Sequence, residues 1–222
     1  MKPALTTKTP MTASNKPVIG FNSPVPLTQP LEFEIGCGKG RFLIDRAGHH
    51  PHTGFIGIDI WWRFLKFAVK RVENLGLSNI RFYKAEAFDF LQNVLPDQSV
   101  SVFHIYFPDP WPKKRQKKNR LFSKEFLELA SRKSTDNAVI RVTTDHEDYY
   151  LQMCGTVIAS EGRWAVQSKR SGISNSPDDT PTHYEAKYRA EGRTLHYAEF
   201  VKRTVNSVPP AFVDTKSTAP LR

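Results

Sequence analysis

Short apolar runs alternate along the chain with segments in which apolar residues recur every three or four positions. Apolar runs bounded by glycine or polar residues predict buried strands, and the periodic segments predict amphipathic helices. In chain order, the predicted elements are strand 31–36, helix 40–48, strand 54–60, helix 61–76, strand 79–85, a short helix from Ala87, strand 99–107, helix 123–133, strand 138–144 and helix 145–160.

This alternation predicts an α/β fold, with a mostly parallel sheet and helices on both of its faces. Segments 163–172 and 195–203 add two strands, which bring the expected sheet to seven and supply an antiparallel edge. The helix predicted over 61–76 should have one apolar face, formed by Trp62, Leu65, Val69 and Val72. Gly76 is its expected C-terminal cap. Ligands of such folds bind beyond the carboxyl ends of the strands.

The two ends of the chain lack this pattern. Residues 1–28 are rich in Thr, Pro, Ser and Lys and predict a flexible basic tail, and residues 206–222 predict a second flexible tail. The stretch between them, residues 29–205, is expected to form one folded domain, because a chain of 222 residues can bury a sizeable core.

Composition excludes several classes of protein. No stretch reaches the roughly 18 consecutive apolar residues of a membrane span, and the N-terminus lacks the apolar core of a secretory signal, so we expect a cytoplasmic protein that does not enter membranes. Cys37 and Cys154 have no Cys or His partner at metal-ligand spacing, which predicts two reduced thiols. The histidine-rich stretch 49–52 has no acidic partner and predicts a solvated loop, so no metal site is expected.

The formal net charge of +10 is concentrated in one place. Six basic residues stand between Lys113 and Arg120, directly after FPDPWP, residues 107–112, which contains Asp109. Concentrated positive charge is typical of a surface that binds a phosphate backbone, and a solvated surface gives the same count. Because the run follows a rigid proline turn around one acid, we interpret it as delivering RNA to Asp109. The predicted backbone contacts are Lys114, Arg115, Lys117, Lys118 and Arg120.

Glycines and acids gather at the predicted carboxyl ends of the first three strands. Glu34 and the following glycines lie at the first, where glycine lets a ligand approach the backbone and the next helix N-terminus. Asp59 ends the second strand, 23 residues after the first glycine, a spacing at which a carboxylate can accept ribose hydroxyls. A lone GxGxG is weak, but three such strand ends predict an adenosine-type cofactor site. Its members are Glu34, Gly36, Gly38, Gly40, Asp59 and Glu86.

The charge of Glu34 discriminates between two adenosine cofactors. A nicotinamide dinucleotide carries a pyrophosphate, which a carboxylate in the strand before the glycines would repel. S-adenosylmethionine carries a sulfonium and an ammonium group, which suit the acids at 34, 59 and 86. The pattern therefore favours the methyl donor.

Taken together, these motifs resemble the bacterial tRNA (guanine-N7)-methyltransferase family, the TrmB type, over about residues 31–203. The resemblance rests on EIGCGKG, GIDI, FPDPWPKKR, TTDH and TPTHYEAKYRAEG, in the order and spacing of the family. The glycine element is common to methyltransferases, whereas FPDPW before a basic run and the late T-x-x-E are specific. The resemblance implies a Rossmann-like class I methyltransferase fold, S-adenosylmethionine as cofactor, tRNA as partner, and formation of N7-methylguanosine at guanosine 46 of the tRNA variable loop.

The same resemblance implies roles for individual residues. It places cofactor contacts at Glu34, Asp59, Glu86 and Asp109, a catalytic role at Asp109, and substrate contacts at Lys113, Asp145, Thr182, His183, Tyr184 and Glu185. The family more often has Glu at 59, Asp at 86 and Phe at 184, and each departure here keeps the charge or the aromatic ring. No obligatory protein partner is evident.

The expected chemistry needs no general base, because guanine N7 carries a lone pair and no proton at neutral pH. The protein must hold the base at near-attack distance and offset the charge that the purine gains, roles open to Asp109, Asp145 and Glu185. Structural interpretations compete: Asp109 as a turn cap, Asp145 as a helix N-cap, and the tryptophans as packing. Two other classes remain open, an RNA-binding module without activity and a methyltransferase for proteins or small molecules.

Overall fold

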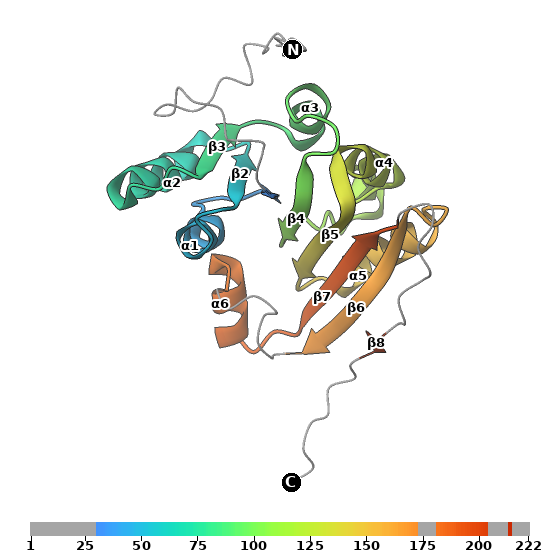
Figure 1. The fold of residues 1–222 in the computed structure, drawn as a ribbon. Coiled ribbons are helices and arrows are strands. Elements are labelled where there is room, and N and C mark those ends of the chain that lie inside the picture. Colours follow the sequence, from blue (N-terminus) through green and yellow to red (C-terminus); the bar gives the residue numbers. More distant parts are fainter. Residues whose placement is uncertain (1–29, 173–180, 204–212, 215–222) are drawn as a thin grey trace, which may run out of the picture.

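An eight-stranded sheet organises the described part of the chain, residues 30–172, 181–203 and 213–214 of a computed structural model (Figure 1). The strand order is β3-β2-β1-β4-β5-β7-β6-β8. The first five strands in this order are parallel, β7 runs antiparallel to both of its neighbours, and β8 is parallel to β6. The strands are β1 (Leu31–Ile35), β2 (Gly54–Asp59), β3 (Ile80–Lys84), β4 (Val100–Tyr106), β5 (Ser134–Thr144), β6 (Trp164–Gly172), β7 (Leu195–Lys202) and β8 (Val213–Asp214).

Helices cover both faces of the sheet, because strand residues point alternately to two cores. In β2, Phe55 packs with α1 and α2, whereas Ile56 packs with the core of α3, α4 and α5. This supports the predicted α/β architecture with helices on two faces. The helices are α1 (Arg41–His49), α2 (Trp62–Leu75), α3 (Ala87–Asn93), η1, a 3-10 helix (Lys114–Asn119), α4 (Lys124–Lys133), α5 (Glu147–Ile158) and α6 (His183–Ala190).

Every strand and helix predicted from the periodicity is present, and three elements were not predicted. These are η1, α6 and β8. The eighth strand consists of Val213 and Asp214, which pair with Ser168 and Lys169 of β6. It lies within the predicted C-terminal tail; the predicted N-terminal tail and the remainder of the C-terminal one fall outside the described residues. The boundaries of domain 29–205 remain a prediction.

The apolar face predicted for α2 is mostly correct. Leu65, Val69 and Val72 are buried, and Gly76 ends the helix in the left-handed conformation with a φ of 64°. The prediction for Trp62 is wrong, since 37% of this residue is exposed. It is the first residue of the helix, where the chain has only begun to turn toward the core.

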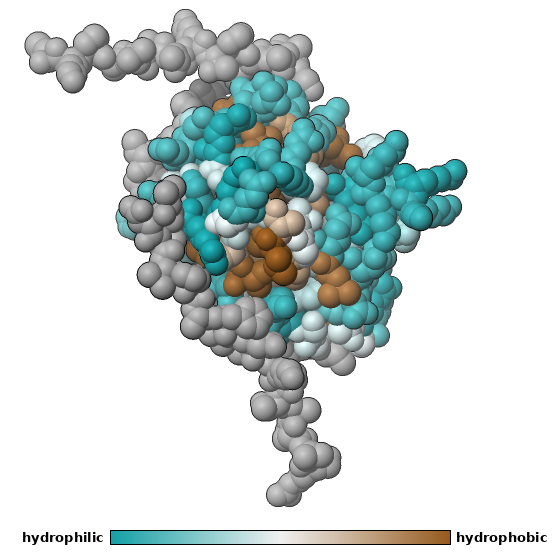
Figure 2. Space-filling model, turned by 90° about the vertical axis from the view of Figure 1, so that its right-hand side faces the viewer, coloured by the Kyte–Doolittle hydropathy of each residue, from teal (hydrophilic) through white to brown (hydrophobic). Residues whose placement is uncertain are grey.

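On the side drawn in Figure 2, hydrophilic residues predominate and the apolar side chains form several separate patches. Both cysteines are free, as the sequence predicts, and both are buried. Within the described ranges, no helix combines the length and the apolar character needed to cross a membrane.

Gly40 is a position where the fold tolerates no side chain. Its φ is 66°, and a Cβ there would lie 2.5 Å from a ring atom of Phe82 and 2.9 Å from the Ala68 Cβ. We expect Gly40→Ala to lower the free energy of unfolding by about 1–3 kcal/mol more than Gly76→Ala does, because overpacking adds to the left-handed strain that both variants share. Gly76 is the matched control, with a φ of 64° and open space around it. Urea unfolding measures both; equal losses would show that the Phe82 ring moves aside without cost.

Candidate active site

The glycine turn after β1 forms an open cradle beside the carboxyl ends of the strands. The Gly36 and Cys37 N–H groups both donate to the Ile58 carbonyl, which fixes the turn against β2. Gly36 and Gly38 have φ values of 78° and 55°, and a Cβ at either would meet no atom within 4 Å. A left-handed backbone next to open space is where glycine lets a ligand approach the main chain.

Glu34 is a buried acid that forms no ion pair with any residue that the structure describes. It is 4% exposed, and its Oε2 atom has no hydrogen-bond partner among the described residues. Burial, with a further contribution from the nearby negative charge of Asp59, raises the pKa of Glu34 to about 8. A buried acid of this kind becomes ionised readily when a cation lies beside it.

Asp59 and Glu86 stand at the ends of the next two strands. Asp59 accepts the Gly38 N–H on Oδ2 at 2.9 Å and the Trp61 N–H on Oδ1 at 2.7 Å, so it links the loops after β1 and β2. Glu86 caps α3 by accepting the Asp89 N–H at 3.0 Å. Each carboxylate oxygen has a second lone pair, which leaves both acids able to accept a ligand's hydroxyl or amine. Because β1, β2 and β3 are neighbours, the structure brings Glu34, Asp59 and Glu86 to one edge of the sheet, as the sequence predicts.

The FPDPW turn follows β4, on the other side of β1. Phe107 donates its N–H to the Thr143 carbonyl at 2.7 Å, and both Phe107 and Trp111 have left-handed backbones, with φ values of 51° and 41°. Asp109 is exposed between them. Burial is the main cause that raises the pKa of Tyr149 to about 12, and the negative charge of Asp109 adds to this rise. Asp109 is therefore presented to solvent by a rigid turn.

Arg120 corrects the predicted set of RNA contacts. Its side chain is 1% exposed, its Nε–H donates to the Pro110 carbonyl at 2.8 Å, and its guanidinium binds Asp148 and Gln152 of α5. The guanidinium also lies over the Tyr149 ring, 4.6 Å from its centroid. Arg120 anchors the FPDPW turn to α5 and is not available to a phosphate, so its prediction as a backbone contact is wrong.

The other basic residues of the run lie on or next to η1. Lys117 is paired with Asp148 at 2.8 Å; hydrogen bonds from Lys117 and Arg120 lower the pKa of that acid to about 2. The four that are exposed are Lys113, Lys114, Arg115 and Lys118. Substrate contact by Lys113 and backbone contact by Lys114, Arg115, Lys117 and Lys118 stay predictions.

Helix α6 carries the predicted T-x-x-E residues and lies beyond the arrowheads of β4 and β5 (Figure 1). Thr182 and Glu185 form a capping box, in which each side chain accepts the other residue's N–H. Glu185 is 2% exposed and also accepts the Tyr197 hydroxyl at 2.9 Å. These contacts hold α6 against β7; substrate contact by Thr182 and Glu185 stays a prediction, and the His183 side chain lies outside the described residues.

An aromatic group joins α6 to the FPDPW turn. The Phe107 ring lies 6.1 Å from Tyr184 and 5.4 Å from Tyr188, measured between centroids, and the Arg193 guanidinium lies 4.2 Å from the Tyr188 centroid. Arg193 also pairs with Asp145 at 2.9 Å. Tyr188 and Arg193 were missed in the sequence; the available signal was the spacing of Tyr184 and Tyr188, which places two aromatic rings on one helical face.

Asp145 is not the cap of α5. That position belongs to His146, whose Nδ1 accepts the Tyr149 N–H at 3.3 Å. The competing interpretation of Asp145 as an N-cap is therefore wrong, and its carboxylate instead accepts a hydrogen bond from Arg193.

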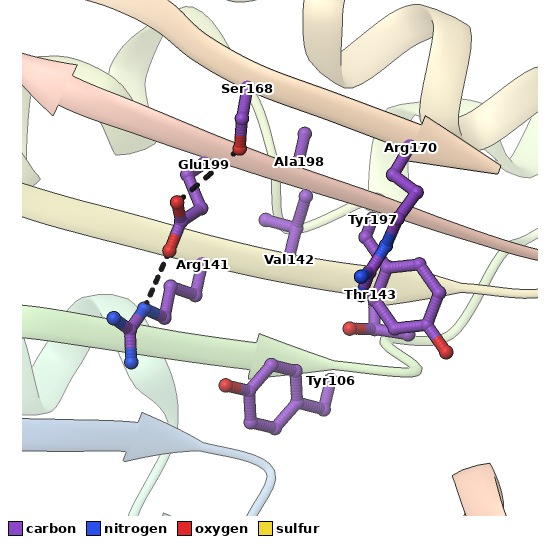
Figure 3. A pocket seen from close by; sticks show the side chains of 9 residues that line it. All are labelled: Tyr106, Arg141, Val142, Thr143, Ser168, Arg170, Tyr197, Ala198 and Glu199. Carbon is purple, nitrogen blue, oxygen red and sulfur yellow. Dashed lines mark hydrogen bonds and ion pairs between the residues drawn. The ribbon is translucent and has the colours of Figure 1, made fainter. Parts of the chain in front are cut away.

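A cavity of about 110 Å³ lies on the sheet beside this site (Figure 3). It contains the Arg141–Glu199 ion pair, with Ser168 donating to Glu199, and the Arg170 guanidinium over the Tyr197 ring. None of the predicted cofactor or substrate residues lines it. We place the candidate site at the strand ends because the unpaired acid and the open glycine turn are there.

The described residues contain no group of three or more His, Cys, Asp or Glu side chains that could hold a metal ion. The donor set fits S-adenosylmethionine instead. The buried Glu34 Oε2, which no described residue hydrogen-bonds, suits a cationic ligand. Gly36 and Gly38, where a Cβ would meet no atom within 4 Å, allow a ligand to lie against the backbone.

This fold and site define a class I methyltransferase. The structure resembles a 16S rRNA (adenine(1408)-N(1))-methyltransferase from Catenulisporales acidiphilia, with a TM-score of 0.59, 13% identity and coverage of 82% of this chain and 91% of that one. It also resembles an antibiotic-related methyltransferase, with a TM-score of 0.56, 18% identity and coverage of 78% and 89%. At these identities the likeness concerns the fold alone.

Sequence comparison identifies the family. A family model described as "Putative methyltransferase" matches residues 28–198. The tRNA (guanine-N(7)-)-methyltransferase of Geobacillus kaustophilus (strain HTA426) is 35% identical over 180 residues, which cover 78% of this chain and 80% of that protein. The enzyme of the same name from Marinobacter nauticus is 35% identical over 165 residues, covering 74% and 68%. The chain belongs to the tRNA (guanine-N7)-methyltransferase family.

Proposed function

We propose that the protein transfers the methyl group of S-adenosylmethionine to N7 of guanosine 46 in tRNA. The observation that carries this proposal is the buried Glu34 carboxyl group, whose Oε2 atom finds no hydrogen-bond partner in the described part of the chain. It stands beside an open glycine turn, and an exposed acid and an exposed cationic run follow the neighbouring strand β4. Membership of the family supports the reaction and the substrate class. The position within tRNA and the roles of single residues are part of the proposal.

The donor site is built from the first three strands. Bound S-adenosylmethionine supplies a methyl group activated by a positively charged sulfur. Glu34 offsets positive charge on the bound molecule, and Asp59, held by two backbone N–H groups, accepts hydroxyls of the ribose. Glu86 stands at the next strand end, where it closes the adenosine side of the site.

The guanine site lies between the FPDPW turn and α6. Asp109 and Asp145 provide carboxylates for the N1–H and N2–H₂ edge of the base, and the exposed Tyr184 ring offers a surface for stacking. The N7 lone pair forms the new bond to the methyl carbon as the bond from carbon to sulfur breaks. No proton moves in this step, and the purine becomes cationic, which the two carboxylates stabilise.

The decisive experiment uses unmodified tRNA transcripts and methyl-labelled donor, followed by nucleoside analysis. We expect label in N7-methylguanosine with a transcript that carries guanosine at position 46 and none with a matched transcript that carries adenosine there. Label in another nucleoside, or equal label in both transcripts, would refute the assignment. A role on tRNA leads us to expect a cytoplasmic protein.

The exposed cations next to Asp109 predict a salt-sensitive contact with RNA. Replacing Lys114 and Lys118 by Gln should lower the slope of log affinity against log salt by about 1.4, or about 0.7 for each single-stranded phosphate contact that is lost. Donor affinity should stay unchanged, since neither residue lies at a strand end of the donor site. Fluorescence anisotropy at several salt concentrations measures the slope; an unaltered slope would make these lysines a solvated surface.

A further inference from the structure

A second cluster of cations and exposed aromatic rings lies on α2 and the adjacent glycine turn. Trp61 and Phe67 are each 52% exposed, although both are large apolar side chains. Around them stand exposed basic residues that pair with no acid in the described ranges. We call this surface the α2 patch; it consists of Lys39, Trp61, Trp62, Arg63, Lys66, Phe67 and Lys70.

Cations and rings in the α2 patch are in direct contact. The Arg63 guanidinium lies 4.8 Å from the Trp61 centroid, and the ammonium groups of Lys39 and Lys66 lie 5.4 Å and 5.2 Å from the Phe67 centroid. Across the ranges described, Lys39, Arg63 and Lys66 form no ion pair with an acid. Their positive charge is therefore not offset by neighbouring carboxylates.

The core does not require the α2 patch. The inward face of α2 is formed by Leu65, Ala68, Val69 and Val72, all buried. The patch residues are exposed: Trp61 and Trp62 stand at the N-terminal end of α2, Lys39 in the glycine turn, and the others on the outward side of the helix. Exposed aromatic rings interleaved with cations form an arrangement typical of surfaces that bind single-stranded nucleic acid, where bases stack on rings and cations hold phosphates.

The position of the α2 patch relates it to the reaction. Trp61 donates its N–H to Asp59, and Lys39 lies between Gly38 and Gly40, so the patch borders the donor site. In the sheet order, β2 and β4 lie on either side of β1. The α2 patch after β2 and the cationic run after β4 therefore flank the glycine turn on its two sides.

We propose that the α2 patch binds the RNA strand next to the target guanosine, with bases stacked on its aromatic rings and phosphates on Arg63 and Lys66. The inference rests on the proposed function, because it takes tRNA as the substrate, and it adds a second contact surface opposite the basic run. Positive charge and the shared border with the donor site favour RNA over a protein partner. A strand held on both sides of the glycine turn would have its target base fixed between them.

The test compares Arg63→Gln/Lys66→Gln, Phe67→Ala and a control, Lys124→Gln/Arg132→Gln, by equilibrium binding of unmodified tRNA. The control removes the same charge from α4, which belongs to the other layer of helices. We expect the first variant to lose about 1.4 from the salt slope and Phe67→Ala to bind on the order of tenfold more weakly with little change in slope. Calorimetry with the donor should give the wild-type affinity in all variants.

The measurements distinguish a failure of the α2 patch as an RNA surface from a failure of the proposed methyl transfer. If the wild type methylates tRNA while both α2 variants bind tRNA like the control, the α2 patch is not an RNA surface and the proposed function stands. If the wild type binds tRNA through the patch but transfers no label, the proposed function fails and the RNA contact stands. If the α2 variants instead lose self-association in sedimentation with tRNA binding unchanged, the patch is a protein interface and the inference is wrong.

Discussion

Replacing Asp109 by Asn should reduce the single-turnover rate of methyl transfer by on the order of 10² to 10³ at saturating tRNA and donor. The exposed carboxylate lies between two left-handed residues in a turn anchored by Arg120, so its place is set by the surrounding chain. Asparagine keeps the size and one acceptor but removes the charge. The contact that is lost grows stronger as the purine becomes cationic, and its loss therefore appears mainly in the rate.

Rapid-quench measurement of methylated tRNA gives this rate, with both substrates saturating because Asp109 is also an expected donor contact. Asp136→Asn, which neutralises an exposed acid at the start of β5, is the matched control and should react at the wild-type rate. A wild-type rate in Asp109→Asn would assign the residue to the turn alone and transfer its role to Asp145 or Glu185.

Glu34→Gln should have two opposite effects, a more stable free protein near pH 8 and a weaker complex with the methyl donor. The pKa of Glu34 is raised from 4.5 to about 8. Between pH 4.5 and pH 8, Glu34 is therefore protonated in the folded state and ionised in the unfolded state. Wild-type stability therefore falls as pH rises from about 4.5 to 8, by up to about 1.4 kcal/mol per pH unit, and levels off above that. Glutamine has no charge to bury, so this fall disappears in the variant.

Glu32, two residues earlier on the same strand, provides a control of opposite sign. Burial acts to raise its pKa, but hydrogen bonds from His104 and Arg46 outweigh burial and lower the pKa to about 2. Its contribution to stability is present above about 4.5 and is lost as pH falls toward 2. Glu32→Gln should therefore destabilise the protein at neutral pH, whereas Glu34→Gln should stabilise it.

Urea unfolding between pH 5 and 9 measures the stabilities, and calorimetry in buffers of different ionisation enthalpy measures donor binding. Below pH 8 the wild type should release a proton as the donor binds, because Glu34 ionises beside a cation, and Glu34→Gln should bind more weakly without that release. Parallel pH profiles for wild type and Glu34→Gln would show that Glu34 is already ionised in the free protein.

The periodicity of the sequence determined the α/β layout, because strands and helices bury residues at different spacings that can be read along the chain. It also determined that Glu34, Asp59 and Glu86 share one edge, since the carboxyl ends of neighbouring parallel strands meet. Helix α6 was not predicted. Its capping box is a local signal in TPTHYE, but a helix this short gains most of its stability from packing, which the sequence does not display.

Only the tertiary structure decided which basic residues are free to bind RNA. In the sequence, Lys118 and Arg120 are equivalent members of one cationic run; in the fold, Arg120 is buried against Tyr149 and Asp148, while Lys118 is exposed. The α2 patch has the same origin, because Lys39 and Lys66 are 27 positions apart in sequence and meet over the Phe67 ring only when α2 packs beside the glycine turn. Charge is a property of the residue, but its availability depends on what the folded chain places around it.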